Sequence, residues 1–295
     1  MAITASDVKK LREMTGAGMM ACKQALGETN GNLEEAVDFL RKKGLAAAQK
    51  KQSRIAAEGV VVSLVEGSTG VLLEVNCETD FVSKGDDFQN FAKEMANAIL
   101  KEKPADIEAL KTAKQEAVNE LTLKCGEKID LRRFDLVEST GVLGSYNHGG
   151  KIGVLIDLKT SAEANNAVVQ ELLKDLAMHA AAAAPKFLKA DEIDEDYKKR
   201  EEEIYSAQLK DEGKPTEMIP KIVQGKLKKL ASEVCFLEQK FVKDPDLTVS
   251  KLIAAKAKEL GTDIELNAFY KLNLGEGIEK KEDNLADEVA KMTGK

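Results

Sequence analysis

The sequence predicts an α+β protein that begins with three short helices and continues with two related units of strands and helices. Three observations support this fold class. Apolar residues recur at helical intervals through the first 45 residues, alternating segments at 60–75 and 142–158 are typical of β-hairpins, and one spaced motif occurs twice in the later part of the chain. At 295 residues the chain is also too long for a single compact core, so we expect two or three domains.

A three-helix module is expected over residues 1–45, where glycine turns separate three segments of helical periodicity. The third segment has the clearest signals, because Asn32 and Glu35 have capping-box spacing and Gly44 stands where a terminal glycine would end the helix. The following residues, 46–58, are basic and lack turn residues, so we expect a helical linker.

The first core unit is expected at residues 59–140. Two apolar segments separated by the turn EGSTG predict a hairpin, two amphipathic segments predict helices, and GEKIDLRRFDLV predicts a closing strand. The expected hairpin strands are 60–65 and 71–75, and the expected helices are about 87–100 and 105–124.

The second core unit repeats this order over residues 141–185 and 233–277. Its expected hairpin is VLGSY, the turn NHGG and KIGVLIDL, and its expected helices span about 163–183 and 248–260. Both units end in a shared pattern G-x-x-I-[DE]-L-x-x-F, which begins at Gly126 in the first unit and at Gly261 in the second. The sequence therefore predicts two ββααβ repeats.

An insertion is expected inside the second unit at residues 186–232. The hairpins are offset by 142 − 60 = 82 residues and the closing motifs by 261 − 126 = 135, which leaves 135 − 82 = 53 additional residues. A charged helical segment, a Gly-Lys-Pro turn and a second helical segment predict an antiparallel helical hairpin of coiled-coil type. Pairing with another protein or with a second copy is expected; a solvated arm is the alternative. The expected apolar seam consists of Ile193, Tyr197, Ile204, Leu209, Met218, Ile222 and Leu227.

The C-terminal residues 278–295 predict a helical module. Leu285, Val289 and Met292 have i, i+4 and i+7 spacing, so a short amphipathic helix is expected to leave the core and dock elsewhere.

Composition excludes several classes of function. The 44 basic and 51 acidic residues give a net charge of −7 and a pI near 5.3, which argues against a protein whose main partner is a phosphate backbone. No apolar stretch approaches the roughly 20 residues that cross a bilayer, and the N-terminal residues lack the apolar core of a targeting peptide, so a cytoplasmic protein is expected. The cysteines are isolated, which supports neither disulfides nor a cysteine zinc site: Cys22, Cys77, Cys125 and Cys235.

Residues for covalent catalysis or nucleotide binding are scarce. The two histidines, His148 and His179, have no carboxylate or histidine at metal-ligand spacing, and no phosphate-binding glycine motif occurs. His179 is expected to be a packed or surface residue of a helix, and His148 an exposed residue of the hairpin turn. Cys77, at a strand end, is expected to be a small apolar residue of the core rather than a nucleophile.

The tetrapeptide TDFV at 79–82 carries the main functional hypothesis. It lies between a strand and a helix, so Phe81 is expected in a polar turn, where an aromatic side chain has no steric purpose. Phe81 either folds back into the core while Thr79 or Asp80 caps the next helix, or it is presented to a partner as an apolar wedge.

Several motifs in order resemble bacterial elongation factor Ts. They are TGAGMMACKQAL (15–26), EVNCETDFV (74–82), GSYNHGGKIGVL (144–155) and GEGIEK (275–280), and the resemblance runs from residue 3 to about 292. It implies a ubiquitin-associated-like (UBA-like) N-terminal module, the two related core subdomains, the inserted coiled coil and the C-terminal module. It also implies a guanine-nucleotide exchange factor for elongation factor Tu that uses no covalent catalysis and no cofactor.

The same resemblance assigns roles to individual residues. Thr79, Asp80, Phe81 and Val82 would enter the GTPase beside its nucleotide, dislocate Mg²⁺ and release GDP. The resemblance implies partner contacts by the C-terminal helix and by further side chains: Arg12, Met19, Met20, Lys23 and His148.

Two other classes of function compete with this hypothesis. An adaptor or chaperone-like protein would use the helical modules for binding and would not change nucleotide release. An enzyme based on Cys77 and His148 would lose its activity when either residue is replaced.

Overall fold

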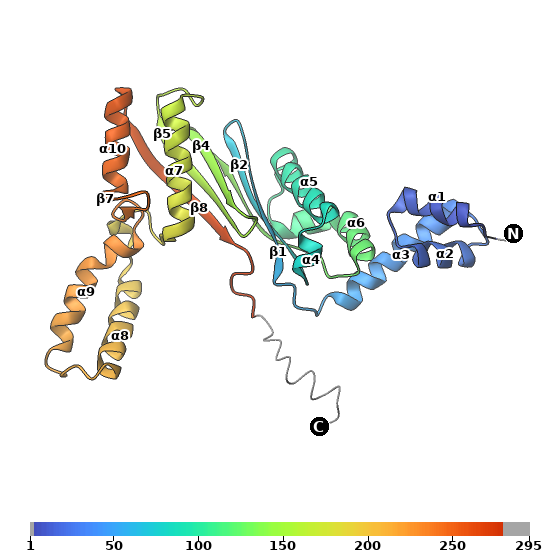
Figure 1. The fold of residues 1–295 in the computed structure, drawn as a ribbon, viewed down its shortest axis with the longest axis horizontal. Helices are drawn as coiled ribbons and strands as arrows, with labels where there is room; N and C mark the ends of the chain where they lie inside the picture. Colours follow the sequence, from blue (N-terminus) through green and yellow to red (C-terminus); the bar gives the residue numbers. More distant parts are fainter. Residues whose placement is uncertain (1–2, 280–295) are drawn as a thin grey trace.

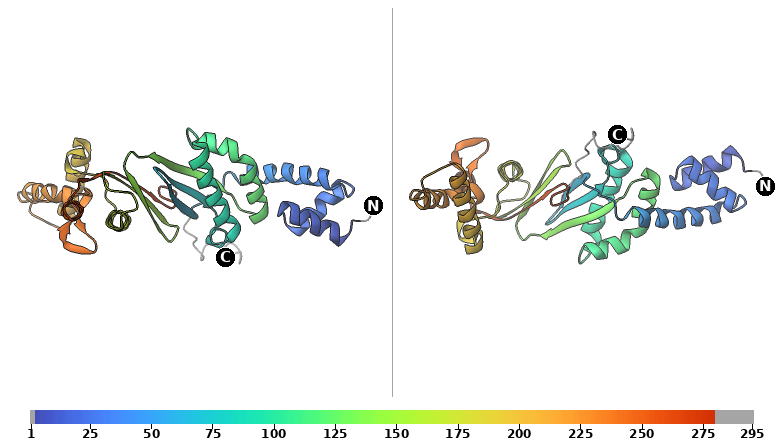
Figure 2. Two further views of the ribbon diagram at one scale, coloured as in Figure 1. Left: turned by 90° about the horizontal axis from the view of Figure 1, so that it is seen from above. Right: turned by 90° about the horizontal axis from the view of Figure 1, so that it is seen from below.

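The computed structural model describes residues 3–279 as an elongated molecule. Helices α1–α3 lie at one end, the hairpin of α8 and α9 lies at the other, and two antiparallel sheets lie between them (Figure 1). The perpendicular views in Figure 2 show the same linear order. The expected C-terminal helix falls almost entirely on residues outside the described range.

Three helices form the N-terminal cluster around its own small core. They are α1 (Ala5–Thr15), α2 (Met19–Glu28) and α3 (Leu33–Lys51). Thr4 caps α1 in a capping box with Asp7, and Gly16 ends it in the left-handed conformation at φ 67°.

The prediction that α3 ends at Gly44 is wrong, because the helix continues to Lys51. The following residues LAAAQKK favour a helix, so the glycine does not terminate it. Gly44 instead allows close packing against α6. A Cβ at this position would lie 3.3 Å from the backbone oxygen of Asn119.

The first sheet has the order β1-β2-β3, with both pairs antiparallel. Its strands are β1 (Glu58–Glu66), β2 (Thr69–Cys77) and β3 (Asp130–Glu138). Helices α5 (Asp86–Glu102) and α6 (Ile107–Cys125) pack against one face, where Phe88, Phe91 and Met95 join the strand side chains in a core. The expected hairpin, helices and closing strand are all present. Between β2 and α5 lies a further short helix, α4 (Asp80–Ser83).

The second sheet has the corresponding order β4-β5-β8. Its strands are β4 (Val142–His148), β5 (Ile152–Thr160) and β8 (Ile264–Asn273), and α7 (Ala167–Ala183) and α10 (Val249–Leu260) join its core. The helix expected from residue 163 begins four residues later, since Asn166 caps it. A two-stranded ribbon of β6 (Lys240–Phe241) and β7 (Asp244–Thr248) was not predicted. Gly126 and Gly261, which begin the repeated motif, are both left-handed helix caps.

The inserted segment forms an antiparallel helical pair, as the sequence predicted. It contains a short 3₁₀ turn (Ala190–Glu192), α8 (Glu195–Asp211) and α9 (Ile219–Val234). Its two ends meet, because the backbone N–H groups of Lys186 and Phe187 both donate to the oxygen of Val234.

The expected seam of this hairpin is partly wrong. Ile204 and Met218 are exposed, whereas Leu209, Ile219 and Val223 form one buried cluster and Ile193 and Leu230 another. Met218 is the cap residue that precedes α9, and the buried positions of this helix begin one residue later, at Ile219. No helix within residues 3–279 is both long and apolar enough to span a membrane.

Candidate functional site

Phe81 points away from the core on the first turn of α4. Its side chain is 87% exposed, more than any other large apolar residue of the described chain. The alternative in which Phe81 folds back into the core is therefore wrong, and the expected polar turn is a short helix. The ring gains no burial energy within this chain and is available for contact with a partner.

The other residues of α4 attach it to the core beneath. Val82 packs against the first hydrophobic core and Ser83 is buried. The hydroxyl of Ser83 donates to the backbone oxygen of Asp80 at 3.0 Å, and Gln89 Nε2 donates to the backbone oxygen of Ser83 at 2.6 Å. Helix α4 therefore has an anchored side and a presented side.

Thr79 caps α4, because its Oγ1 accepts a hydrogen bond from the backbone N–H of Val82 at 3.4 Å. The sequence allowed either Thr79 or Asp80 as the cap, and the cap is Thr79. Thr79 is held in turn by the carboxylate of Glu127, whose Oε1 accepts from the threonine hydroxyl at 2.6 Å.

Asp80 presents a carboxylate beside Phe81. Its Oδ2 accepts from Lys84 Nζ at 2.6 Å, and this hydrogen bond lowers the pKa of Asp80 from its ordinary value, with the charges of Lys84 and Lys151 acting in the same direction. The side chain remains about half exposed and is ionised at neutral pH. The presented side of α4 thus combines an apolar ring with a negative charge.

His148 is the last residue of β4 rather than a turn residue, and it is exposed. Its Nδ1 lies 3.0 Å from the hydroxyl of Tyr146. The adjoining turn is fixed to the first sheet. Asn147 Nδ2 donates to the backbone oxygen of Val61 at 2.7 Å, and the backbone N–H of Val61 donates to the oxygen of Gly150 at 2.7 Å.

An ion pair brings the His148 turn and the α4 element to one end of the first sheet. Lys151 Nζ lies 2.8 Å from Glu58 Oε2, and Glu58 pairs in register with Cys77, the last residue of β2 before α4. Helix α4 packs against β1, the strand that carries Glu58, so the turn lies at the same end of the first sheet as α4. The charge of Lys151 also contributes to the lowered pKa of Asp80. Two of the three groups of candidate residues therefore converge.

The third group lies elsewhere. Arg12 is on α1, and Met19, Met20 and Lys23 are on α2. All four side chains are exposed, so each is available for contact. They lie near the turn between α1 and α2, on the side of the N-terminal cluster that faces α6: a Cβ at Gly16 would lie 3.4 Å from the Lys124 side chain. A partner that touches both groups must contact the N-terminal cluster as well as α4.

The geometry disfavours a thiol enzyme. Cys77 is buried, and burial, with the charge of Glu127 adding to it, raises the pKa of its thiol to about 12. His179 is fully buried, as one of its two expected placements had it. Its Nε2 lies 2.9 Å from Gln239 Oε1, and its ring stacks on Phe236. Among residues 3–279, no group of three or more His, Cys, Asp or Glu side chains is placed to hold a metal ion.

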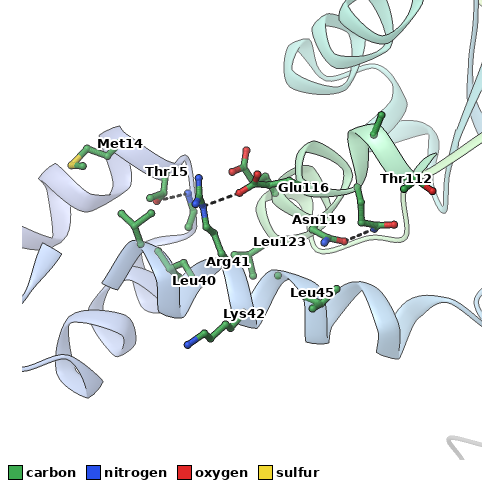
Figure 3. Close-up of a pocket in the computed structure, with 16 residues that line it drawn as sticks. Met14, Thr15, Leu40, Arg41, Lys42, Leu45, Thr112, Glu116, Asn119 and Leu123 are labelled. Carbon is green, nitrogen blue, oxygen red and sulfur yellow. Dashed lines mark hydrogen bonds and ion pairs between the residues drawn. The ribbon is translucent and has the colours of Figure 1, made fainter. Parts of the chain in front are cut away.

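A groove of about 710 Å³ lies between the N-terminal cluster and α6. Met14, Leu40 and Leu45 line its apolar part, and an ion pair of 2.9 Å between Arg41 Nε and Glu116 Oε1 crosses it (Figure 3). None of the residues that line the groove belongs to α4. We assign it no role in the chemistry of the site, and its ion pair joins α3 to α6.

Sequence reasoning missed three residues that organise the site: Glu127, Asn147 and Lys151. Each acts through a contact between segments that are at least 48 positions apart in the chain. The one available signal was that Asn147 and Lys151 lie within NHGGK, part of the motif at 144–155. Nothing local distinguishes Glu127 from the other glutamates.

Comparisons with known proteins agree on one family. A family model described as elongation factor TS matches residues 78–276, which is more than half of the chain and includes α4. The elongation factor Ts of Syntrophotalea carbinolica is 48% identical over 304 residues, covering 99% of this chain and 100% of the relative. That of Clostridium perfringens strain SM101 is 48% identical with the same coverage, and that of Clostridioides difficile is 48% identical with 98% coverage of each.

Proposed function

The chain belongs to the elongation factor Ts family of translation elongation factors, and we propose that it binds elongation factor Tu·GDP and accelerates the release of GDP. In this proposal the protein displaces Mg²⁺ and loosens the phosphate-binding region of the GTPase, after which GTP rebinds. It performs no covalent chemistry.

The exposure of Phe81 on an anchored helix is the observation that carries this proposal. A phenylalanine ring that enters an apolar site on a partner contributes about 1.5–3 kcal/mol, which corresponds to roughly one to two powers of ten in a rate or equilibrium constant. This energy accelerates release only if it is gained in the loosened state of the GTPase, because a contact made equally in both states shifts nothing.

The remaining candidate residues receive complementary roles. Asp80 places its charge beside the ring, and Thr79 and Val82 cap and anchor the helix that carries it. The His148 turn contacts the GTPase next to this element. A second contact comes from the N-terminal cluster, through Arg12, Met19, Met20 and Lys23, so part of the binding energy does not depend on the wedge.

Thermodynamic linkage gives the proposal a further consequence. If this protein weakens the binding of GDP by a given factor, then GDP weakens the binding of this protein by the same factor. Added nucleotide with Mg²⁺ therefore displaces the protein from the complex. This reciprocity lets the factor act in repeated cycles.

The decisive experiment measures release of a fluorescent GDP analogue from elongation factor Tu in the presence of Mg²⁺. The wild-type protein is compared with Phe81→Ala and with Val242→Ala, a matched removal of an exposed apolar side chain from the distant ribbon. We expect fast release with the wild type and with Val242→Ala. Release with Phe81→Ala should be about 10- to 100-fold slower, while complex formation is largely retained.

The same experiment tests the rival functions. An adaptor would bind the GTPase and leave the release rate at its spontaneous value, which would refute the exchange-factor proposal. Equal rates for wild type and Phe81→Ala would refute the wedge while leaving exchange activity itself in place.

A further inference from the structure

Glu127 lies outside the TDFV segment but contacts it at three points. It follows Gly126, the cap of α6, and precedes β3. Glu127 Oε2 accepts hydrogen bonds from the backbone N–H groups of Glu78 at 3.1 Å and Thr79 at 3.0 Å, while its Oε1 accepts from the Thr79 hydroxyl at 2.6 Å. One carboxylate therefore accepts three hydrogen bonds from the two residues that lead into α4.

The hydrogen bonds continue from Glu127 into α4. The Thr79 hydroxyl donates to the carboxylate and at the same time accepts from the backbone N–H of Val82. Linked hydrogen bonds of this kind polarise and strengthen one another where water is partly excluded. A helix of four residues is not stable by itself, so its orientation depends on such external contacts.

A second carboxylate makes the reciprocal contact. Glu78 Oε1 accepts from the backbone N–H of Lys128 at 2.7 Å, and Glu78 also pairs with Arg54 Nη1 at 3.2 Å. The side chains of Glu78 and Glu127 thus each form hydrogen bonds between the residues that follow β2 and those that precede β3. Glu127 makes the contacts that reach α4 directly, and Glu78 holds the strand ends together.

We propose that Glu127 is a positioning residue that holds α4 in the orientation from which Phe81 enters the GTPase. This inference rests on the proposed function. Its physical basis is preorganisation: a wedge on a loosely held segment spends part of its binding energy on ordering that segment, whereas a fixed wedge does not. Glu127 itself acts only through Thr79 and the α4 backbone and is not expected to touch the nucleotide.

The test is a set of Glu127 and Thr79 variants, assayed by release of the fluorescent GDP analogue across a range of factor concentrations. We expect Glu127→Ala to lower the plateau rate about tenfold, with the half-saturating concentration changed less than about threefold. Glu127→Gln keeps an oxygen that accepts from the two backbone N–H groups, so it should recover most of the rate. Glu94→Ala, an exposed position of α5, is the control.

A double-mutant cycle separates positioning from general stability. Since Glu127 acts through Phe81, Glu127→Ala should change the rate less than about twofold when Phe81→Ala is already present. Thr79→Val, which removes the hydroxyl that joins Glu127 to the Val82 N–H, should lower the plateau at least as much as Glu127→Ala, while Thr79→Ser should retain it. The Thr79 pair keeps the test valid if Glu127→Ala fails to fold.

The outcomes are distinguishable. A wild-type protein that does not accelerate release refutes the proposed function and this inference together. If the wild type is active, a full plateau rate for Glu127→Ala or Thr79→Val, or independent effects of Glu127→Ala and Phe81→Ala, overturns the inference alone.

Discussion

Glu74 and Asp157 occupy matching positions in the two sheets, each where the central strand changes register against the closing strand. In the first sheet the register shift leaves Arg132 without a partner residue on β2, and its Nη1 donates to Glu74 Oε1 at 2.9 Å. In the second sheet the shift leaves Asn267 without a partner residue on β5, and its Nδ2 donates to Asp157 Oδ2 at 2.6 Å. Each irregularity thus directs an extra polar side chain to a buried carboxylate, and the two repeats share this feature beyond their common motif.

The Glu74 cluster is expected to contribute more stability than the Asp157 cluster. Glu74 is fully buried and also accepts from Arg133 Nε at 2.7 Å and from the backbone N–H of Gly275 at 2.8 Å. Glu74→Ala leaves the guanidinium groups of Arg132 and Arg133 without this carboxylate and should lower the free energy of unfolding by about 3 kcal/mol. Asp157→Ala removes an acceptor from neutral donors and should cost about half as much. Urea unfolding of both variants tests this, and equal losses would contradict it.

Local sequence patterns predicted most element types but not their long-range arrangement. The hairpins, α5, α6 and the closing strands all follow from apolar periodicity, because each buries one face against its neighbours. The end of α3 could not be predicted, since Gly44 serves a contact with Asn119 that lies 75 positions away. The ribbon of β6 and β7 was missed because its strands are too short for a periodic signal.

The candidate site was predictable only in part for the same reason. The TDFV segment was identified from its unusual composition and family resemblance, but the exposure of Phe81 depended on tertiary structure. Whether a phenylalanine next to a strand end turns inward or outward is decided by contacts such as those of Val82 and Glu127. These contacts join segments that no local pattern connects.

The same substitution should destabilise the fold strongly at Phe88 and hardly at all at Phe81. Phe88 is 1% exposed in the first core, so Phe88→Ala should lower the free energy of unfolding by about 3–5 kcal/mol. Phe81→Ala removes a ring that contributes little to folding and should change it by less than about 0.5 kcal/mol. Thermal or urea unfolding provides the measurement. A large destabilisation by Phe81→Ala would show that this ring packs in the core in solution.

Asn147 is expected to support the binding surface by holding the His148 turn against β1. Its Nδ2 donates to the Val61 oxygen, and its Oδ1 accepts from the Gly150 N–H at 2.7 Å. Asn147→Ala removes both hydrogen bonds and should weaken binding of nucleotide-free elongation factor Tu by about 5- to 20-fold, measured by calorimetry. Asn147→Asp keeps the acceptor and should lose less. Unchanged affinity for Asn147→Ala would argue against a contact role for this turn.

His179 predicts a pH-dependent contribution to stability. Burial lowers its pKa from the ordinary value of 6.5, and its Nδ1 accepts from the backbone N–H of Val242, so the folded state holds the neutral ring. Below about pH 6.5 the unfolded chain binds a proton that the folded chain does not. The contribution of His179 to the free energy of unfolding is therefore complete above that pH. It falls by up to about 1.4 kcal/mol per pH unit as the pH decreases from the pKa of the unfolded state to the lower pKa of the folded state.

Urea unfolding between pH 7.5 and 5.5 tests the His179 prediction, with His179→Gln as the reference. The wild type should lose more stability than the variant over this range, because only the wild type has the buried titrating ring. Parallel pH profiles would show that His179 is protonated to the same extent in both states.

The helical hairpin of α8 and α9 is expected to mediate self-association, as its sequence suggested. Ile204 and Met218 remain exposed although the hairpin buries Leu209, Ile219 and Val223 internally, so apolar surface is left over for a second copy. Replacing Ile204 and Met218 together with glutamate should shift sedimentation toward the monomer. The matched control is Gln208→Glu with Gln224→Glu, which adds the same two negative charges at other exposed positions of α8 and α9. A wild-type protein that sediments as a monomer at all concentrations would instead support the solvated-arm alternative.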